Sequence, residues 1–336
     1  MDRSPIVFIV GNSRSGTTLM ARILNRHPDV YILKETHLME EFAAIRQLTH
    51  FDRATLTQTV NRMLTIQKKG YYRKNRVETY PETVGIVDAL LKNGDLSFND
   101  IAQHLFAFEV QKRNKKIPGD QTPRHVFYIS EIKRMFPDAL FINMIRDPRG
   151  VLLSQKYKWK AGVRQRVPRF ETIRTFFNYH PALISIMWRK GIKNALFVDE
   201  AIKRSSMLNV KFEELTEHPE ATMSAVCNFL GISYSDKMLD VTVGMSSTGT
   251  DEGKAGISRN VSKAWMDKLS PTDTYIGEKI NKDLMARLGY PLSRVKPDPL
   301  KITQFLIVLP FQVIIIYFLN LNRMGNAWAF IKKRLK

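Results

Sequence analysis

Pro5-Ile-Val-Phe-Ile-Val-Gly-Asn-Ser-Arg-Ser-Gly-Thr-Thr18 is the stretch that decides the expected fold. Its first half, Pro5 to Val10, is β-branched and aromatic, which is typical of a buried parallel strand. A helical pattern of apolar residues follows from Leu19 to Leu24. A strand, a glycine-containing loop and a helix in this order predict an anion site, because loop amides and the helix N-terminus present partial positive charge.

The loop also offers side chains to a phosphate, through hydroxyl groups and one cation. The predicted cofactor-binding residues here are Ser13, Arg14, Ser15, Gly16, Thr17 and Thr18. A nucleotide-triphosphate loop would read Gly-x4-Gly-Lys-Ser/Thr, and Thr17 stands where that lysine would be. No strand ends in an aspartate suited to magnesium, so no metal site is predicted. A kinase-like enzyme using a magnesium nucleotide is the second hypothesis.

Composition narrows the possible partners. The chain has 336 residues, a formal net charge of +20 and one cysteine, Cys227. The charge suits a polyanionic nucleotide, an acidic polymer or an anionic membrane. No zinc-finger spacing or RNA-binding signature accompanies the basic residues, so no nucleic-acid partner is expected. Cys227 lies in an apolar context, which predicts a buried structural thiol.

A later strand in the sequence supplies another cation. The segment Arg134 to Arg146 reads as a helix end, a turn and a buried strand, with Arg146 at the strand's carboxyl end. Ligands of open α/β sheets collect outside the carboxyl ends of strands, so Arg14 and Arg146 should face one crevice. Ser154, two turns later, can point at the same anion. The alternative is an ion pair of Arg146 with Asp147 that caps a helix.

The stretch from Pro5 to Met20, followed by Asn25-Arg-His-Pro-Asp-Val30, resembles the sulfotransferases that use 3′-phosphoadenosine-5′-phosphosulfate (PAPS), especially the tyrosylprotein and Golgi-type branch. The resemblance implies that the loop binds the 5′-phosphosulfate. It implies further that Arg146 and Ser154 bind the 3′-phosphate, with adenosine 3′,5′-bisphosphate as the product. The acceptor would be a hydroxyl or amine of a glycan, a lipid or another hydroxylated molecule.

Glu35 matches the glutamate that such enzymes use as the base, at the end of a probable second strand. In-line transfer needs an acceptor that loses its proton as it attacks and cations that stabilise the developing charge. Glu35 and Arg14 are therefore the expected catalytic residues. His37 is a substitute base, and a surface or helix-capping role for Glu35 is the alternative.

One position departs from the family pattern. Many relatives carry a lysine before Thr-Pro or Asp-Pro, and this chain has Gln121 in Gly119-Asp-Gln-Thr-Pro123. A neutral amide donates a hydrogen bond without the lysine's charge. Either Arg14 and Lys34 compensate or turnover is slow. A nucleotide-binding scaffold with weak catalysis is a third hypothesis.

The segment Gly253 to Trp265 is polar, basic and glycine-bearing. It is similar to the loop with which the family closes over the 3′-phosphate and adenine. Arg259 and Lys263 are the candidate contacts, and an ordinary solvated loop is the alternative.

The order of elements predicts an α/β fold, a P-loop-like parallel sheet flanked by helices, in a sulfotransferase domain over residues 1–298. Residues 40–116 form a helical insertion, expected on the acceptor side. Residues 299–336 form an apolar, basic-ended tail, with a nearly continuous apolar run from Ile302 to Leu321 and a basic end from Lys332 to Lys336.

The tail predicts contact with a membrane surface. Because the amino-terminal strand is too short for a signal peptide, a cytoplasmic, membrane-associated enzyme is expected. A re-entrant or monotopic anchor fits better than a simple crossing, which would leave the basic end outside. A helix buried on the domain or on a partner subunit is the alternative, and the oligomeric state stays open.

Overall fold

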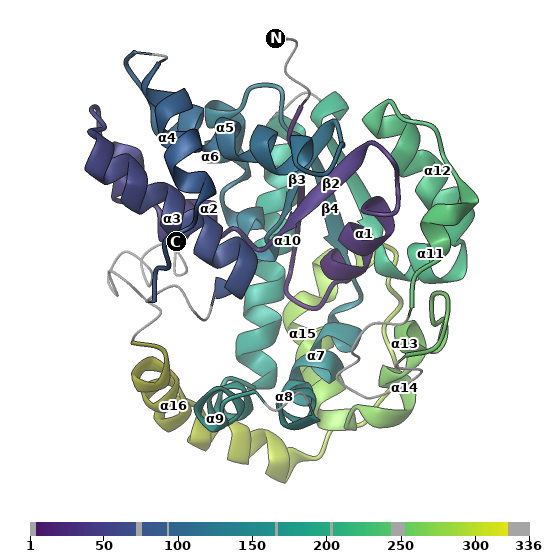
Figure 1. Ribbon diagram of the computed structural model, residues 1–336. Helices are drawn as coiled ribbons and strands as arrows, with labels where there is room; N and C mark the ends of the chain where they lie inside the picture. The colour runs from purple at the N-terminus through teal and green to yellow at the C-terminus, as the bar shows by residue number, and fades with distance from the viewer. Residues whose placement is uncertain are drawn as a thin grey trace. The chain divides into compact units, whose positions relative to one another are not determined.

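The computed structural model describes residues 5–71, 76–92, 94–164, 167–201, 204–242 and 253–321 (Figure 1). The chain forms two compact units. The first comprises residues 1–146, 191–242 and 255–257, and the second comprises residues 147–190, 243–254 and 258–336. The basic end of the tail, Lys332 to Lys336, lies outside the described residues.

A parallel sheet forms the centre of the first unit. Within the described residues it has five strands in the order β2-β3-β1-β4-β5, every pair of neighbours being parallel. The strands are β1 (Val7–Gly11), β2 (Val30–Lys34), β3 (Ile117–Gln121), β4 (Leu140–Ile145) and β5 (Met207–Lys211). The predicted α/β fold with a parallel sheet is confirmed.

Strand β3 was not predicted, because Pro118 and Gly119 are both rare inside strands. The structure gives the reason for the glycine. A Cβ atom at Gly119 would lie 2.6 Å from the carbonyl oxygen of Val7 and would clash with Ile32. The two strands beside β3 approach too closely for a larger residue.

Alternating side chains of β1 bury both faces of this sheet. Phe8 and Val10 belong to one apolar core, and Val7 and Ile9 belong to another that also contains Cys227, buried as expected. The helices of the first unit are α1 (Thr17–Leu24), α2 (Leu38–Glu41), α3 (Arg53–Lys69), α4 (Glu82–Leu91), α5 (Phe98–Gln111), α6 (Ile129–Met135), α11 (Phe212–Glu217) and α12 (Pro219–Leu230). Helix α10 (Pro181–Ala201) begins in the second unit and ends in the first.

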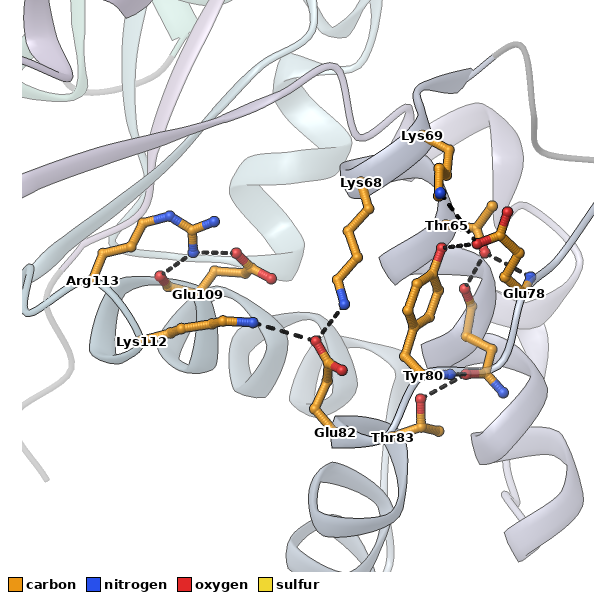
Figure 2. A network of polar contacts seen from close by, with 11 residues as sticks. Thr65, Lys68, Lys69, Glu78, Tyr80, Glu82, Thr83, Glu109, Lys112 and Arg113 are labelled. Carbon is orange, nitrogen blue, oxygen red and sulfur yellow. Dashed lines mark hydrogen bonds and ion pairs between the residues drawn. The ribbon is translucent and has the colours of Figure 1, made fainter.

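Helices α3, α4 and α5 confirm the helical character predicted for residues 40–116. A polar network joins them (Figure 2). Glu82, at the start of α4, accepts hydrogen bonds from Lys68 of α3 and from Lys112, which follows α5. The hydrogen bond from Lys68, together with the contact to Lys112, lowers the pKa of Glu82 to about 2. The insertion is thus held together by charge as well as by apolar packing.

The second unit is helical in its described part. Its helices besides α10 are α7 (Pro148–Lys156), α8 (Lys158–Arg164), α9 (Arg169–Phe177), α13 (Asn260–Lys263), α14 (Trp265–Lys268), α15 (Pro271–Arg287) and α16 (Pro299–Asn320). Arg149 is buried beneath the Trp265 ring, 3.8 Å from its centroid, and pairs with Asp147 at 2.6 Å and Glu278 at 2.8 Å. This cluster ties α7 to α14 and α15. It also shows that the predicted partner of Arg146, Asp147, is engaged by Arg149.

Gly11 is the position where the fold tolerates a side chain least. Its φ is +144°, and an added Cβ would overlap the carbonyl oxygen of Met144 on β4. Because backbone cannot move aside as a flexible side chain can, Gly11→Ala should lower the free energy of unfolding by about 1–3 kcal/mol. Urea unfolding measures the loss. Gly85→Ala is the control, since Gly85 lies in helix α4 with open space around it and should be neutral or stabilising. Equal effects of the two changes would contradict the strand contact.

Candidate active site

Four strands of the first unit place candidate site residues at one edge of the sheet. Strand β1 ends at Gly11, where the glycine-containing loop begins, and β3 ends at Gln121. Glu35 follows β2, and Arg146 follows β4. Since the strands are parallel and in register, with Ile9 opposite Gln121 and Gln121 opposite Lys34, their carboxyl ends lie together. This edge is the candidate active site.

The loop between β1 and α1 has the backbone shape of an anion cradle. Arg14 and Gly16 both have positive φ, 76° and 92°, and the Ser15 amide donates to the Asn12 carbonyl oxygen at 3.1 Å. A non-glycine residue at positive φ is strained, which is typical of functional loops. Ser15 Oγ is buried and makes no hydrogen bond to any described residue. A buried hydroxyl without a partner fits a ligand that brings an acceptor, as a phosphosulfate does.

Thr17 and Thr18 begin helix α1, where the first amides lack partners within the helix. Thr17 is buried, whereas Ser13 and Thr18 are exposed. The loop therefore has both buried and exposed hydroxyl groups beside its backbone amides.

Arg146 lies directly against this loop. It is buried, and its Nη1 donates to the Arg14 carbonyl oxygen at 3.0 Å. Its guanidinium stacks on the Phe212 ring, 4.3 Å from the centroid. The same ring lies where a Cβ of Gly16 would be, so Phe212 supports both the loop and the cation. The expectation that Arg14 and Arg146 share one crevice is consistent with this contact.

The sequence patterns gave Phe212 no role in the site. Its position directly after β5 puts it at the same sheet edge as the other site residues. That position was the available signal, but an apolar side chain carries no charge or hydroxyl that marks it as part of a site.

Arg14 and Glu35 influence each other electrostatically. Burial lowers the pKa of the Arg14 guanidinium, and the negative charge of Glu35 opposes this shift. Because a guanidinium remains charged at physiological pH, the edge combines a permanent cation with a carboxylate.

Glu35 and His37, the expected base and its substitute, are in contact with each other. Glu35 Oε2 lies 3.1 Å from His37 Nε2, and the Glu35 side chain is 49% exposed while His37 is nearly buried. His37 has a positive φ of 50° and packs its ring against Tyr71, with 3.9 Å between centroids. Packing against Tyr71 therefore holds the His37 ring in place, and the ring can orient the exposed Glu35 carboxylate.

Beneath Glu35 lies a buried pair that the sequence did not reveal. Asp120 Oδ2 is 2.9 Å from His125 Nδ1, and both side chains are fully buried. Asp120 Oδ1 accepts from the Thr36 amide at 3.1 Å and from the Thr122 hydroxyl at 3.0 Å. Asp120 therefore ties the residue after Glu35 to the end of β3. Its place before Gln121 was a possible signal, but the fold of β3 was needed to show the contact.

Burial disfavours the charged imidazole of His125, but the charges of Asp120, Glu40 and Glu35 outweigh it and raise the pKa of His125. His125 is thereby a cation in a carboxylate cluster over a wider pH range than a free histidine.

Gln121 is also bound within the site. Its Nε2 donates to Thr17 Oγ1 at 3.1 Å, and its side chain is buried. The amide therefore links β3 to the start of helix α1. Where the family resemblance implies a lysine, this chain has a neutral donor in contact with the phosphate loop.

The other predicted cofactor residues belong to the second unit. Ser154 is buried on α7, and Arg259 and Lys263 are exposed at the two ends of the turn that forms α13. The Arg259 carbonyl oxygen accepts from Ser262 Oγ at 2.8 Å, which stabilises that turn. Their convergence with Arg146 on one phosphate stays a prediction.

Comparison with known proteins agrees with this geometry. A family model described as "Sulfotransferase family" matches residues 5–236, which include the loop, Glu35, Gln121 and Arg146. The chain belongs to the sulfotransferase family. It is therefore a PAPS-dependent sulfotransferase family enzyme, and the kinase-like and scaffold hypotheses are not supported.

Two sulfotransferases illustrate the sequence similarity. Protein-tyrosine sulfotransferase 2 of Gallus gallus is 27% identical over 315 residues, which cover 88% of this chain and 73% of the relative. Protein-tyrosine sulfotransferase 1 of Homo sapiens is 24% identical with the same coverage. Among solved structures, the sulfotransferase domain of the Synechococcus PCC 7002 olefin synthase superposes with a TM-score of 0.53 at 20% identity, covering 87% of this chain and 96% of that domain. This superposition supports the fold.

Replacing Arg146 tests its proposed role. Arg146→Ala should weaken binding of adenosine 3′,5′-bisphosphate by about 10- to 100-fold, because a charged hydrogen-bond donor is worth roughly 1.5–3 kcal/mol. Titration calorimetry measures the affinity. Arg53→Ala is the control, since Arg53 is exposed on α3 and pairs with Asp88 at 2.7 Å. Unchanged affinity of the Arg146 variant would refute the role.

The raised pKa of His125 makes a prediction about stability. A group whose pKa is raised on folding contributes stability that is full below its unfolded pKa, about 6.5, and lost as the pH rises through its folded pKa. The difference in unfolding free energy between wild type and His125→Asn should therefore be largest at acidic pH and shrink toward alkaline pH. Urea titrations from pH 5.5 to 9 measure it. A difference that grows with pH would show the opposite sign of coupling.

Proposed function

We propose that this sulfotransferase transfers the sulfuryl group of PAPS to the phenolic hydroxyl of a tyrosine in a protein or peptide. The observation that carries the proposal is the position of Arg14 after β1 and Glu35 after β2, at the sheet edge that also holds Arg146. A cation for the transferred group and a carboxylate for the acceptor proton occur in one site. The similarity to protein-tyrosine sulfotransferases over 88% of the chain supports tyrosine as the acceptor.

In this proposal the cofactor is held at both of its charged ends. The loop residues Ser13 to Thr18 bind the 5′-phosphosulfate through amides and hydroxyls, with Arg14 beside them. Arg146 binds the 3′-phosphate with Ser154, and Arg259 and Lys263 complete that side. PAPS supplies an activated sulfuryl group on a phosphate leaving group.

The chain's own residues manage one proton and the negative charge. The acceptor oxygen bonds to sulfur as the sulfur bond to the bridging oxygen breaks, which releases adenosine 3′,5′-bisphosphate. Glu35 accepts the acceptor's proton while His37 holds its carboxylate. Arg14 stabilises charge on the transferred group. Gln121 contributes only a neutral amide, and it already donates to Thr17.

A tyrosine acceptor suits a site with a carboxylate base and a neutral amide at Gln121. The phenol has an ordinary pKa near 10, so it gives up its proton to a carboxylate more readily than a sugar or alkyl hydroxyl. The helical insertion, residues 40–116, is the proposed acceptor side, because it supplies Tyr71 behind His37. Glycan and lipid hydroxyls are the competing acceptors.

We also propose that the enzyme associates with a membrane through its tail, residues 299–336, with the domain over residues 1–298 on the cytoplasmic side. Helix α16 supports membrane contact. None of its residues is buried, and it is long and apolar enough to cross a membrane.

Transfer from 35S-labelled PAPS to matched peptides tests the function. A peptide with one tyrosine should be labelled, and the same peptide with phenylalanine or serine in its place should not. Labelling of a glycan or lipid extract in preference to the peptide would overturn the tyrosine proposal. Glu35→Gln should lower kcat for the peptide by at least about 100-fold with adenosine bisphosphate affinity unchanged. Glu220→Gln, an exposed carboxylate on α12, is the control.

A further inference from the structure

Helix α16 is fixed to the second unit along a narrow stripe. Its less exposed residues recur at spacings of three and four. They are Ile302, Phe305, Leu309, Gln312, Ile316 and Leu319, and Asn320 next to the last of them is also less exposed. The rest of the helix faces outward, with Leu306, Phe311 and Phe318 each about two-thirds exposed, at 66%, 64% and 64%. An outward surface this apolar is unusual for a helix on a water-soluble protein.

The polar residues of α16 are used for docking. Gln312 Nε2 donates to the carbonyl oxygens of Phe177 and Tyr179, at 2.7 and 2.6 Å. Asn320 Oδ1 accepts from Arg174 Nη1 at 2.8 Å, and its amide donates to Asn178 Oδ1 at 3.0 Å. Gln312 and Asn320 therefore face the protein, whereas most of the outward residues of the helix from Leu306 onward are apolar.

Helix α9 beside it has the same inverted polarity. Arg174 is buried and pairs with Glu171 at 2.9 Å. Phe170, Ile173 and Phe176, spaced three residues apart on one face, are each half-exposed, at 53%, 50% and 53%. Figure 1 shows α9 against α16, and the hydrogen bond from Arg174 to Asn320 joins them. A helix in water would be expected to bury the phenylalanines and expose the arginine.

Helix α8 extends this arrangement. It packs on α9, where Gly162 allows close approach to Thr172. The Trp159 ring meets Phe176 edge to face at 5.8 Å, and Val163 is exposed. Tryptophan is a residue that prefers the boundary between membrane and water.

We propose that α8, α9 and α16 together form one membrane-binding surface, which lies flat on an anionic bilayer with α16 in the interfacial plane. The proposal rests on the membrane association proposed for α16 and extends it to α8 and α9. Residues Val163, Phe170, Ile173, Phe176, Phe311 and Phe318 enter the boundary between headgroups and acyl chains. Inverted polarity is favourable there, since the outward face meets hydrocarbon and the inward face meets protein carbonyls and a buried ion pair.

Charge selects the bilayer as the occupant of this surface. From Tyr157 to Phe170 the sequence has five basic residues and no acidic one. They are Lys158, Lys160, Arg164, Arg166 and Arg169. Anionic headgroups attract such a segment by about 1 kcal/mol per basic residue near the surface. A second copy of the chain would instead bring two basic segments together, which electrostatic repulsion disfavours.

The docking of α16 also argues against a crossing. Its length, about 33 Å for 22 residues at 1.5 Å each, would suffice to span. Leaving its place, however, would break the four hydrogen bonds of Gln312 and Asn320 described above and strip the cover from buried Arg174. Lying flat keeps all of these contacts.

Vesicle flotation tests the surface. The full chain is synthesised without detergent in the presence of phosphatidylcholine vesicles with or without added phosphatidylglycerol, whose anionic headgroups attract basic residues. The double variant Phe170→Asp/Ile173→Asp should bind the anionic vesicles at least tenfold more weakly than the wild type. Phe197→Asp is the matched control, because Phe197 is 71% exposed on α10 in the first unit. It should bind as the wild type does.

The outcomes separate the proposals. A double variant that still binds as the wild type does would mean that α16 anchors the chain alone, and the shared surface would be wrong. If the wild type bound neither the neutral nor the anionic vesicles, membrane association itself would be wrong. Equal binding to neutral and anionic vesicles would remove the charge argument, and a dimer abolished by the double variant would assign the surface to a second copy. Unchanged melting temperature and unchanged affinity for adenosine 3′,5′-bisphosphate confirm that the variant is folded, whatever the acceptor class.

Discussion

Parallel pairing of β1 with β3 on one side and β4 on the other is the constraint on which the site depends. It brings the phosphate loop, Gln121 and Arg146 to one edge, and pairing of β2 with β3 adds Glu35. The close approach has little tolerance, because Gly11 touches the backbone of β4 and Gly119 touches the backbone of β1. Gly11 permits the close contact of β1 with β4, and Gly119 permits that of β1 with β3. The sheet therefore fixes the geometry of the loop before any ligand binds.

Much of this arrangement could be predicted from the sequence, and the limits have physical causes. The strand, loop and helix from Pro5 to Leu24 were predictable because local residue patterns specify them. Strand β3 was not, because its proline and glycine are there for neighbours that lie far away in the sequence. Phe212 was missed for the same reason, because it contacts Arg146 and lies against Gly16, both far away in the sequence. Asp120 and His125 are only five residues apart, but the fold of the chain after β3 was needed to show their contact.

The site also distributes charge in an uneven way. Arg146 donates to the carbonyl oxygen of Arg14, so this cation helps to hold the loop. After β2 and β3 carboxylates dominate, with Glu35, Glu40 and Asp120 around two histidines. Gln121 lies between these regions and carries no charge. Its hydrogen bond to Thr17 therefore makes it a mechanical link between strand and loop, whatever it contributes to the leaving group.

The contacts of Gln312 determine whether the tail can be removed from the enzyme. Because its amide serves the carbonyl oxygens of Phe177 and Tyr179, α16 completes the end of α9 in the way that a capping residue completes a helix. Arg174 likewise uses Asn320 as one of its acceptors. A chain shortened before Pro299 would lose more than an anchor. It would gain unsatisfied backbone groups next to a buried arginine, so the apolar helix is an integral wall of the second unit and not a detachable appendage.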